Sequence, residues 1–174
     1  MKLELAVLIM LPALALQAAE IRSDFASGRA YYQQGDFKKA LIHFQRALKT
    51  DPNNAEVYYW TGMSYQGLGD VATPFGARYH SKARAYLRKA VDLAPGRTHY
   101  RRELFDCFLD SAQSSPSALK TAAGMLREAR DHYPEDEYQE MVSRLEKERK
   151  ISSSVEARFD RLFQVIPDVA GQIW

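Results

Sequence analysis

The sequence has one cysteine, Cys107, among 174 residues, so no disulfide can form within the chain. Its stability must therefore come from packing, and Cys107, which stands among apolar neighbours, is expected to be a buried and inert thiol. A net charge of +2 gives no general attraction to nucleic acid, and no nucleic-acid partner is expected. The composition, 46% hydrophobic and 26% charged, is that of an ordinary globular protein.

The sequence also lacks the motifs of catalysis and cofactor binding. Its four histidines lie in four different segments, and no two of them have the spacing of a metal site. A glycine-rich phosphate loop is missing, as are the motifs of serine hydrolases and zinc proteases. We therefore predict no enzyme activity, no catalytic residues, no cofactor and no bound metal.

Long hydrophobic runs are missing except near the amino terminus. Residues 5–16 form an apolar run that is too short to span a bilayer, with Lys2 before it and small residues after it. This layout is typical of a secretory signal peptide over residues 1–19, cleaved near Ala18 or Ala19. We expect an exported protein, periplasmic or extracellular, and the alternative is an uncleaved amino-terminal membrane anchor.

The sequence does contain an internal repeat. The strings ALIHFQRALKTDP, ARAYLRKAVDLAP and AAGMLREARDHYP begin at Ala40, Ala83 and Ala122 and align without gaps. Each has Ala, then Phe or Leu four residues later, Ala three further on, and Pro five beyond that. The i, i+4, i+7 spacing marks one face of a helix, and the Pro ends it. Because another segment with helical periodicity precedes each string, the sequence predicts three pairs of helices.

These segments resemble the tetratricopeptide repeat family, whose 34-residue helix–turn–helix unit has the pattern W-x2-L-G-x2-Y, A-x3-F and P. Gly28 with Tyr31 and Gly62 with Tyr65 occupy the G-x2-Y positions, whereas the third repeat has Phe105 at the glycine position. The resemblance, which is to exported bacterial members, implies an all-α fold in which helix–turn–helix repeats stack into a right-handed superhelix. The repeats are predicted within residues 20–134, at residues 21–54, 55–97 and 98–134.

Two further helices are predicted after the repeats. Residues 135–150 have a single apolar face, which fits a capping helix at the end of the stack. Residues 151–174 form an amphipathic helix and tail, with a capping box at Ser153 and Glu156 and a stop at Pro167. This terminal helix is expected either to pack on the last repeat as a further cap or to dock in a groove or on another molecule.

The resemblance also implies a binding site, because tetratricopeptide repeats bind other proteins along a concave groove lined by the first helix of each pair. The family's clamp for a terminal carboxylate is not supported, since its positions here hold Phe25, Arg29, Trp60, His99 and Glu103 in place of a set of Lys, Asn and Arg. Aromatic, Met and Arg side chains are common at protein interfaces. By repeat position, the groove residues would be Phe25, Arg29, Tyr32, Tyr59, Met63, Gln66, His99, Arg102 and Asp106.

Repeats two and three exceed the 34 residues of the family unit. Their lengths, from one terminal Pro to the next, are 43 and 39 residues, and comparison with repeat one places nine and five extra residues in the turn between the paired helices. In repeat two, the standard Gly-Asp turn would fall at Gly69 and Asp70. Thr73 then fits an N-cap and Pro74 a first helical position, so the second helix is expected from about Pro74 to Leu93.

The lengthened second helix of repeat two is rich in positive charge. The segment from Asp70 to Arg102 has eight Lys or Arg and two Asp. Arg78, Lys82 and Arg84 form a candidate basic edge, which could contact an acidic protein or an anionic membrane surface. The alternative is that these side chains form a solvated helix face.

The function predicted from these features is that of a non-catalytic interaction module or scaffold of the cell envelope, which binds another protein or peptide through the groove. The basic edge would add a second contact. The alternative is a structural subunit of a larger envelope complex, or an oligomer assembled through residues 153–166.

Overall fold

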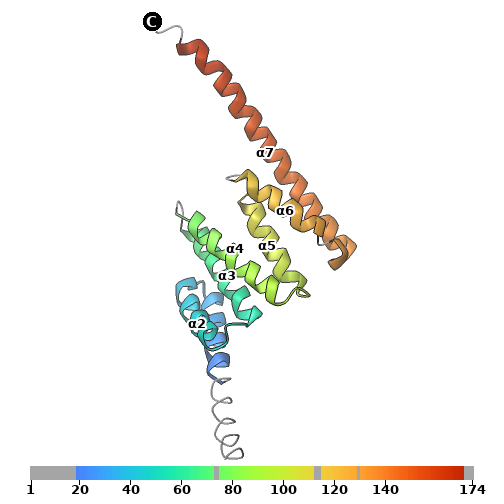
Figure 1. Ribbon diagram of the computed structural model, residues 1–174. Helices are drawn as coiled ribbons and strands as arrows, with labels where there is room; N and C mark the ends of the chain where they lie inside the picture. Colours follow the sequence, from blue (N-terminus) through green and yellow to red (C-terminus); the bar gives the residue numbers. More distant parts are fainter. Residues whose placement is uncertain (1–18, 73–74, 112–114, 129, 171–174) are drawn as a thin grey trace, which may run out of the picture. The chain divides into compact units, whose positions relative to one another are not determined.

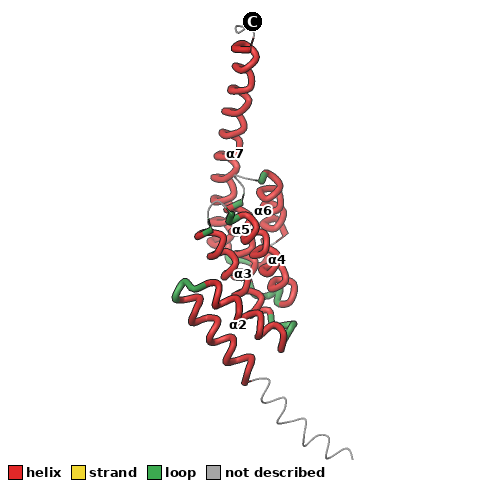
Figure 2. The backbone as a smooth tube through the Cα atoms, turned by 90° about the vertical axis from the view of Figure 1, so that its left-hand side faces the viewer, coloured by secondary structure: helices red, strands yellow, loops and turns green. Residues whose placement is uncertain are grey.

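A computed structural model describes residues 19–72, 75–111, 115–128 and 130–170, with the backbone alone for residue 116 and residues 156–170. Every regular element in these ranges is helical (Figures 1 and 2), which confirms the predicted all-α repeat fold. The elements are a helix over residues 19–33, α2 (Phe37–Thr50), α3 (Ala55–Val71), α4 (Ala77–Leu93), α5 (Thr98–Asp110), α6 (Pro116–Glu128), the 3₁₀ helix η1 (Arg130–His132) and α7 (Glu135–Ala170).

The chain divides into two compact units, Met1–Leu104 and Phe105–Trp174. The predicted signal peptide lies outside the described residues except for Ala19, and so do Thr73 and Pro74, the expected start of a helix. None of the described helices combines the length and the apolar character needed to cross a membrane.

In the first unit, a glycine in each helix pair receives a large side chain from the partner helix. Gly28 lies against Phe44, so close that an added Cβ would stand 2.5 Å from Phe44 Cε1. Gly62 lies against Leu87 in the same way, with an added Cβ 2.7 Å from Leu87 Cγ. Phe44 and Leu87 are both 0% exposed. This recurrence is what the predicted alignment of repeats one and two requires.

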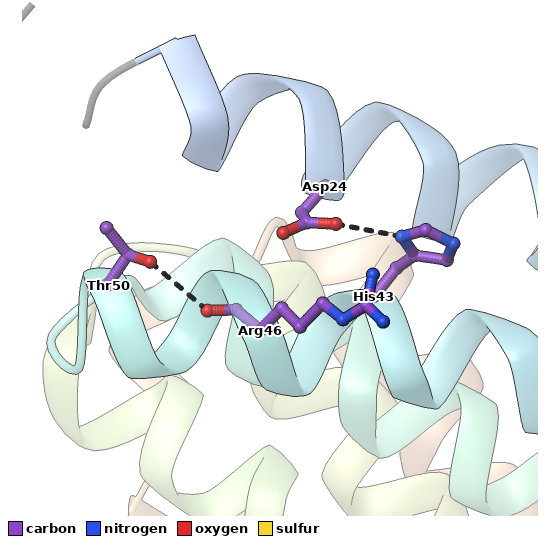
Figure 3. A network of polar contacts seen from close by, with 4 residues as sticks. All are labelled: Asp24, His43, Arg46 and Thr50. Carbon is purple, nitrogen blue, oxygen red and sulfur yellow. Dashed lines mark hydrogen bonds and ion pairs between the residues drawn. The ribbon is translucent and has the colours of Figure 1, made fainter. Parts of the chain in front are cut away.

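Polar contacts support the first helix pair beside this apolar centre (Figure 3). His43 Nδ1 on α2 lies 2.8 Å from Asp24 Oδ1 on the preceding helix, and the His43 ring stacks on Tyr31 with 5.4 Å between centroids. Near the end of α2, Thr50 Oγ1 donates a hydrogen bond of 3.3 Å to the carbonyl of Arg46. The first contact fixes how the two helices face each other, because it joins side chains from both.

The nine extra residues of repeat two are shared between its helices and the link that joins them. Relative to repeat one, α3 ends four residues later, the link gains two residues, and α4 begins three residues earlier. Gly69 and Asp70 therefore lie in the last turn of α3, whereas the equivalent Gly35 makes a turn with a φ of 75°. The predicted Gly-Asp turn of repeat two is wrong, and α4 begins at Ala77 and not near residue 74.

Close backbone packing explains why these two helices extend. A Cβ on Gly76 would overlap the carbonyl oxygen of Gly69, and a Cβ on Gly69 would stand 2.5 Å from His80 Cε1. His80 Nε2 also lies 3.7 Å from Asp70 Oδ1. Glycine costs a helix about 1 kcal/mol relative to alanine, but here it permits an approach that a side chain would block.

Because of the extension, one end of repeat two continues beyond repeat one; we call this difference in length the step of the first unit. Phe37, the first residue of α2, lies against Gly67 of α3, where an added Cβ would stand 2.5 Å from Phe37 Cζ. Helix α3 continues for four residues beyond this contact. Val71 and Phe75 lie in the part of repeat two that repeat one does not match, and each is 71% exposed.

The second unit is built around Phe105, which is 0% exposed. Helix α7 contributes Met141 and Leu145 to this core, as expected of a capping helix, and Cys107 is buried as predicted. The Arg144 guanidinium Nη1 donates to Asp106 Oδ1 at 2.7 Å and so ties α7 to α5. The buried residues of the core are Phe105, Leu109, Ala122, Leu126, Tyr133, Met141 and Leu145.

Helix α7 runs without a break for 36 residues, from Glu135 to Ala170. The predicted division into a capping helix and a separate terminal helix is therefore wrong. At the expected break, Ser153 Oγ donates to the carbonyl of Lys150 at 3.0 Å and Ser154 Oγ to that of Ile151 at 2.8 Å. Serines that bond back to the preceding turn are compatible with a continuous helix. The side chains from residue 156 onward lie outside the described part, so their packing or docking stays a prediction.

Candidate functional site

A continuous line of side-chain contacts crosses the first helices of the repeats in the first unit. The Arg29 guanidinium carbon lies 4.8 Å from the centroid of the Trp60 ring, and the Tyr32 ring lies 5.1 Å from it. Tyr59 continues the line, at 5.3 Å from Trp60 and 4.7 Å from Tyr100 between centroids. We call this the first-helix surface; it consists of Phe25, Arg29, Tyr32, Tyr59, Trp60, His99 and Tyr100.

The two ends of the first-helix surface are Phe25 and His99. The Phe25 centroid lies 6.0 Å from the Arg29 guanidinium carbon, and the His99 ring lies 5.4 Å from that of Tyr59. The Tyr59 and His99 rings meet at 79°, an edge-to-face arrangement that aromatic pairs favour. Tyr100 is 2% exposed, His99 is exposed and the other members are partly buried. The rings are thus held by their neighbours while most keep some accessible surface.

The three tyrosines of this surface, Tyr32, Tyr59 and Tyr100, all have raised pKa values, and the shifts of Tyr59 and Tyr32 involve a shared carboxylate. Burial raises the pKa of Tyr59 well above its ordinary value of 10.0, and the Glu103 carboxylate raises it further. Burial is also the main reason that the pKa of Tyr32 is raised, with added contributions from Glu103 and Asp70. Both hydroxyls therefore stay protonated and can donate hydrogen bonds to a bound ligand. The effect of Glu103 on both rings places a negative charge near this surface.

These shifts predict how the protein responds to alkali. Because the folded-state pKa of Tyr59 exceeds the unfolded value, its contribution to stability is complete below pH 10.0 and is lost as the pH rises above that value. In a titration followed by tyrosinate absorbance, Tyr59→Phe should remove amplitude from the part above pH 10.0. Tyr79→Phe, which removes a hydroxyl that accepts a hydrogen bond of 3.1 Å from Arg78 Nη2, serves as the control. If Tyr59→Phe instead lost absorbance amplitude from the part of the titration below pH 10.0, the prediction would be contradicted.

The structure brings together five of the nine residues predicted to line the groove: Phe25, Arg29, Tyr32, Tyr59 and His99. Met63 and Gln66 follow Tyr59 at i+4 and i+7 on α3 and are partly buried, as is Arg102 on α5. Asp106 belongs to the second unit and is ion-paired with Arg144. It is therefore not part of the first-helix surface.

Three residues of this region were missed as groove residues by repeat position. Trp60 and Glu103 enter the sequence prediction only as positions of a carboxylate clamp, and Tyr100 falls between two predicted groove positions. Repeat spacing selects residues on a single face of each helix. Large aromatic rings, however, also contact residues on the adjacent face and on the neighbouring helix. Adjacent aromatics, as in Tyr58-Tyr59-Trp60, are the signal in the sequence that could have identified Trp60.

The predicted basic edge lies on α4. Arg78 is exposed and stacks on its neighbour Tyr79, with 4.8 Å from the guanidinium carbon to the ring centroid. The Lys82 ammonium lies 5.3 Å from the centroid of the Tyr65 ring, and Arg84 is partly buried. Each of the first two cations is therefore oriented by an aromatic ring, a contact that a purely solvated side chain would not make.

The first-helix surface can stack on apolar groups, donate hydrogen bonds through tyrosine hydroxyls and present charges of both signs. Within the described ranges, no cluster of three or more His, Cys, Asp or Glu could hold a metal ion. The side chains of this surface are suited to non-covalent recognition.

Comparison with known proteins finds one family model that matches part of the chain. A search of curated proteins finds no match to this chain. The family model described as TPR repeat matches residues 28–69, which run from the glycine under Phe44 to the last turn of α3. TPR repeats generally mediate protein–protein interactions, and the family is typically a non-catalytic interaction module. The match thus covers part of the chain, from the first predicted repeat into the second, and it includes the close contact of Gly28 with Phe44.

Proposed function

We propose that this protein is a non-catalytic interaction module of the cell envelope, which binds a segment of another protein along the first-helix surface. The observation that carries the proposal is the unbroken line of contacts from Phe25 through Arg29, Trp60 and Tyr59 to His99. The place in the envelope rests on the amino-terminal segment over residues 1–19 alone.

The composition and order of this surface favour tight binding. Trp, Tyr and Arg are the side chains that most often dominate the binding energy of protein interfaces. Ordering a side chain on binding costs about 0.5–1.5 kcal/mol, and this cost is reduced where a ring is already packed. Arg29 is held over Trp60, and Trp60 is held between Tyr32 and Tyr59. A partner would therefore meet a surface that is largely ordered before binding.

Site-specific photocrosslinking tests this proposal. The crosslinking residue p-benzoylphenylalanine is placed at Met63, one turn after Tyr59 on α3, and separately at Asn53, in the exposed turn before α3. We expect one defined adduct from Met63 and none from Asn53. Equal adducts from both positions, or an adduct from Asn53 alone, would count against the first-helix surface.

The captured partner is then purified and titrated against variants of the full chain. Arg29→Ala should weaken binding about tenfold, because it removes a cation stacked on the central ring of the surface. Arg22→Ala, an exposed arginine on the same helix, makes the same chemical change outside the surface and should leave the affinity unchanged. Equal effects from the two variants would mean that binding responds to net charge and not to this surface.

The alternative function, a structural subunit or self-assembled oligomer, makes a different prediction about mass. Size-exclusion chromatography with light scattering should show a stable monomer if the protein is an interaction module. An obligate oligomer that dissociates when residues 153–166 are removed would favour the alternative.

A further inference from the structure

A cavity of about 480 Å³, widely open to solvent, lies between α2, α3 and α4 in the first unit. This volume is within the range of cavities that hold a ligand or a large side chain. The cavity is separate from the first-helix surface, since the two share no residue. It is lined by Gln45, Leu48 and Lys49 of α2, Tyr58 of α3, and Ala85 and Tyr86 of α4.

Two lining residues of this cavity, Tyr58 and Tyr86, belong to a cluster of packed tyrosines that also includes Tyr65. The Tyr86 ring lies 5.9 Å from Tyr58 and 5.3 Å from Tyr65 between centroids. Tyr65 is 7% exposed, and its hydroxyl accepts a hydrogen bond of 3.5 Å from Gln45 Nε2. Contacts from three helices thus fix the rings, and the opening between them exists before any ligand arrives.

Two of the three helices that border the cavity, α2 and α4, are strongly basic. Helix α2 has four Lys or Arg and no Asp or Glu, and α4 has five Lys or Arg and one carboxylate, Asp92. Lys49 lines the cavity itself, and Lys82 lies over the Tyr65 ring, which packs behind the lining residue Tyr86. The carboxylates of α3 are Glu56 and Asp70, near its two ends. Lys39 is paired with Asp36, before α2.

From this arrangement we propose a second binding site, in which the cavity takes a large apolar side chain from an acidic segment of a partner protein. Carboxylates on either side of that side chain meet Lys49 on α2 and Lys82 on α4. The tyrosine rings provide apolar contact for the inserted group, and their hydroxyls provide hydrogen bonds. The proposal extends the predicted basic edge of α4, because it adds the cations of α2 and a place for an apolar anchor.

The cavity distinguishes this ligand from an anionic membrane. A bilayer surface is met by lysine and arginine side chains through charge alone, and it gains nothing from a recess between helices. A peptide gains from both, since charge speeds association and the buried apolar group slows dissociation. The proposed site therefore requires the recess as well as the charge.

The test uses the full chain and a defined probe, a capped, fluorescent peptide in which one phenylalanine is flanked by glutamates. Two matched peptides have serine for the phenylalanine, or glutamines for the glutamates. Vesicles containing phosphatidylserine serve as the membrane probe. The first variant is Ala85→Trp, which fills the cavity from an exposed lining residue without a change of charge. Its control is Ala30→Trp, at an exposed position on the helix of residues 19–33.

The second variant is Lys82→Glu, and its control is Lys147→Glu, which makes the same change of net charge in the second unit. We expect the wild-type chain to bind the phenylalanine–glutamate peptide saturably, with an affinity that falls as salt is added. Ala85→Trp and Lys82→Glu should each weaken binding about tenfold, and both controls should bind like the wild type. The serine and glutamine peptides should each bind more weakly than the parent peptide.

Three results would overturn the proposal. One is the absence of saturable binding of the peptide to the wild-type chain. The second is equal binding of the peptide by Ala85→Trp and the wild type, which would mean that the cavity is not used. The third is binding of the vesicles with no preference for the phenylalanine peptide over the serine peptide, which would assign the basic helices to a membrane surface.

Discussion

Replacing Gly62 with valine should lower the free energy of unfolding of the first unit by about 3 kcal/mol or more. An added Cβ alone would stand 2.7 Å from Leu87 Cγ and 3.2 Å from the carbonyl oxygen of Ala83. Leu87 is 0% exposed and cannot move away without displacing its neighbours. Because repeat units stabilise one another through their interfaces, damage to the middle helix pair should weaken its contacts on both sides.

The measurement is urea denaturation followed by the fluorescence of Trp60. The chain has two tryptophans, so a Trp174→Phe background makes this signal specific to the first unit. Gly96→Val is the control, since Gly96 has nothing within 4 Å of an added Cβ and no positive φ. Its effect should stay within about 0.5 kcal/mol. If both variants unfold at the same urea concentration, the close packing of Gly62 on Leu87 is not what holds the pair together.

At the equivalent position of repeat three, the opposite change should be harmful. Phe105→Gly would restore the residue that the family pattern has there, yet we expect it to cost the second unit about 4 kcal/mol or more. The ring is 0% exposed in a core shared by α5, α6 and α7, so its removal would leave a cavity among Leu126, Met141 and Leu145. Resemblance to the family pattern alone would predict that Phe105→Gly increases the stability of the second unit.

Circular dichroism during urea denaturation measures this effect. Asp110→Gly is the control, because it places glycine at an exposed position at the end of the same helix and reports the backbone cost without a cavity. That cost should not exceed about 1 kcal/mol. A Phe105→Gly protein as stable as Asp110→Gly would show that Phe105 is not central to the core.

The register of the first two repeats could be predicted from sequence because it depends on the sizes of the side chains that face each other in each helix pair. A glycine on one helix and a large side chain on the other form a complementary pair, and their spacing is visible in the chain at Gly28 with Phe44 and at Gly62 with Leu87. The third repeat shows the limit of this rule. Phe105 fills the position by itself, and its partners on α7 lie more than thirty residues away in the sequence.

The ends of the helices were predicted less well, since they depend on contacts that local signals do not contain. Gly69 and Asp70 have the composition of a turn, but the approach of Gly76 and His80 keeps them in α3. Ser153 has the composition of an N-cap, but its hydroxyl bonds to the preceding turn. In each case, a polar or small residue was assigned its commonest local role and takes another.

In the candidate sites, too, some residues could be predicted from their spacing in the sequence, whereas others depend on contacts between helices. Residues on one stripe of the first helices, such as Arg29 and Tyr59, follow from spacing. The cavity between α2 and α4 does not, because its lining joins residues from three helices and its charge includes α2, which the sequence did not mark as basic beside α4. Nothing in the local sequence around Tyr86 on α4 indicates that its ring lies 5.9 Å from that of Tyr58 on α3.

The step at the end of repeat two has a consequence for motion. Up to Gly67, α3 is covered by Phe37, so opening that part would break contacts of repeat one. Beyond it, the last turn of α3 and the start of α4 pack on each other through Gly69, Gly76 and His80. Local opening costs least where few neighbours must be disturbed. We therefore expect the portion of this helix pair beyond Gly67 to open at a lower free-energy cost than the portion that Phe37 covers.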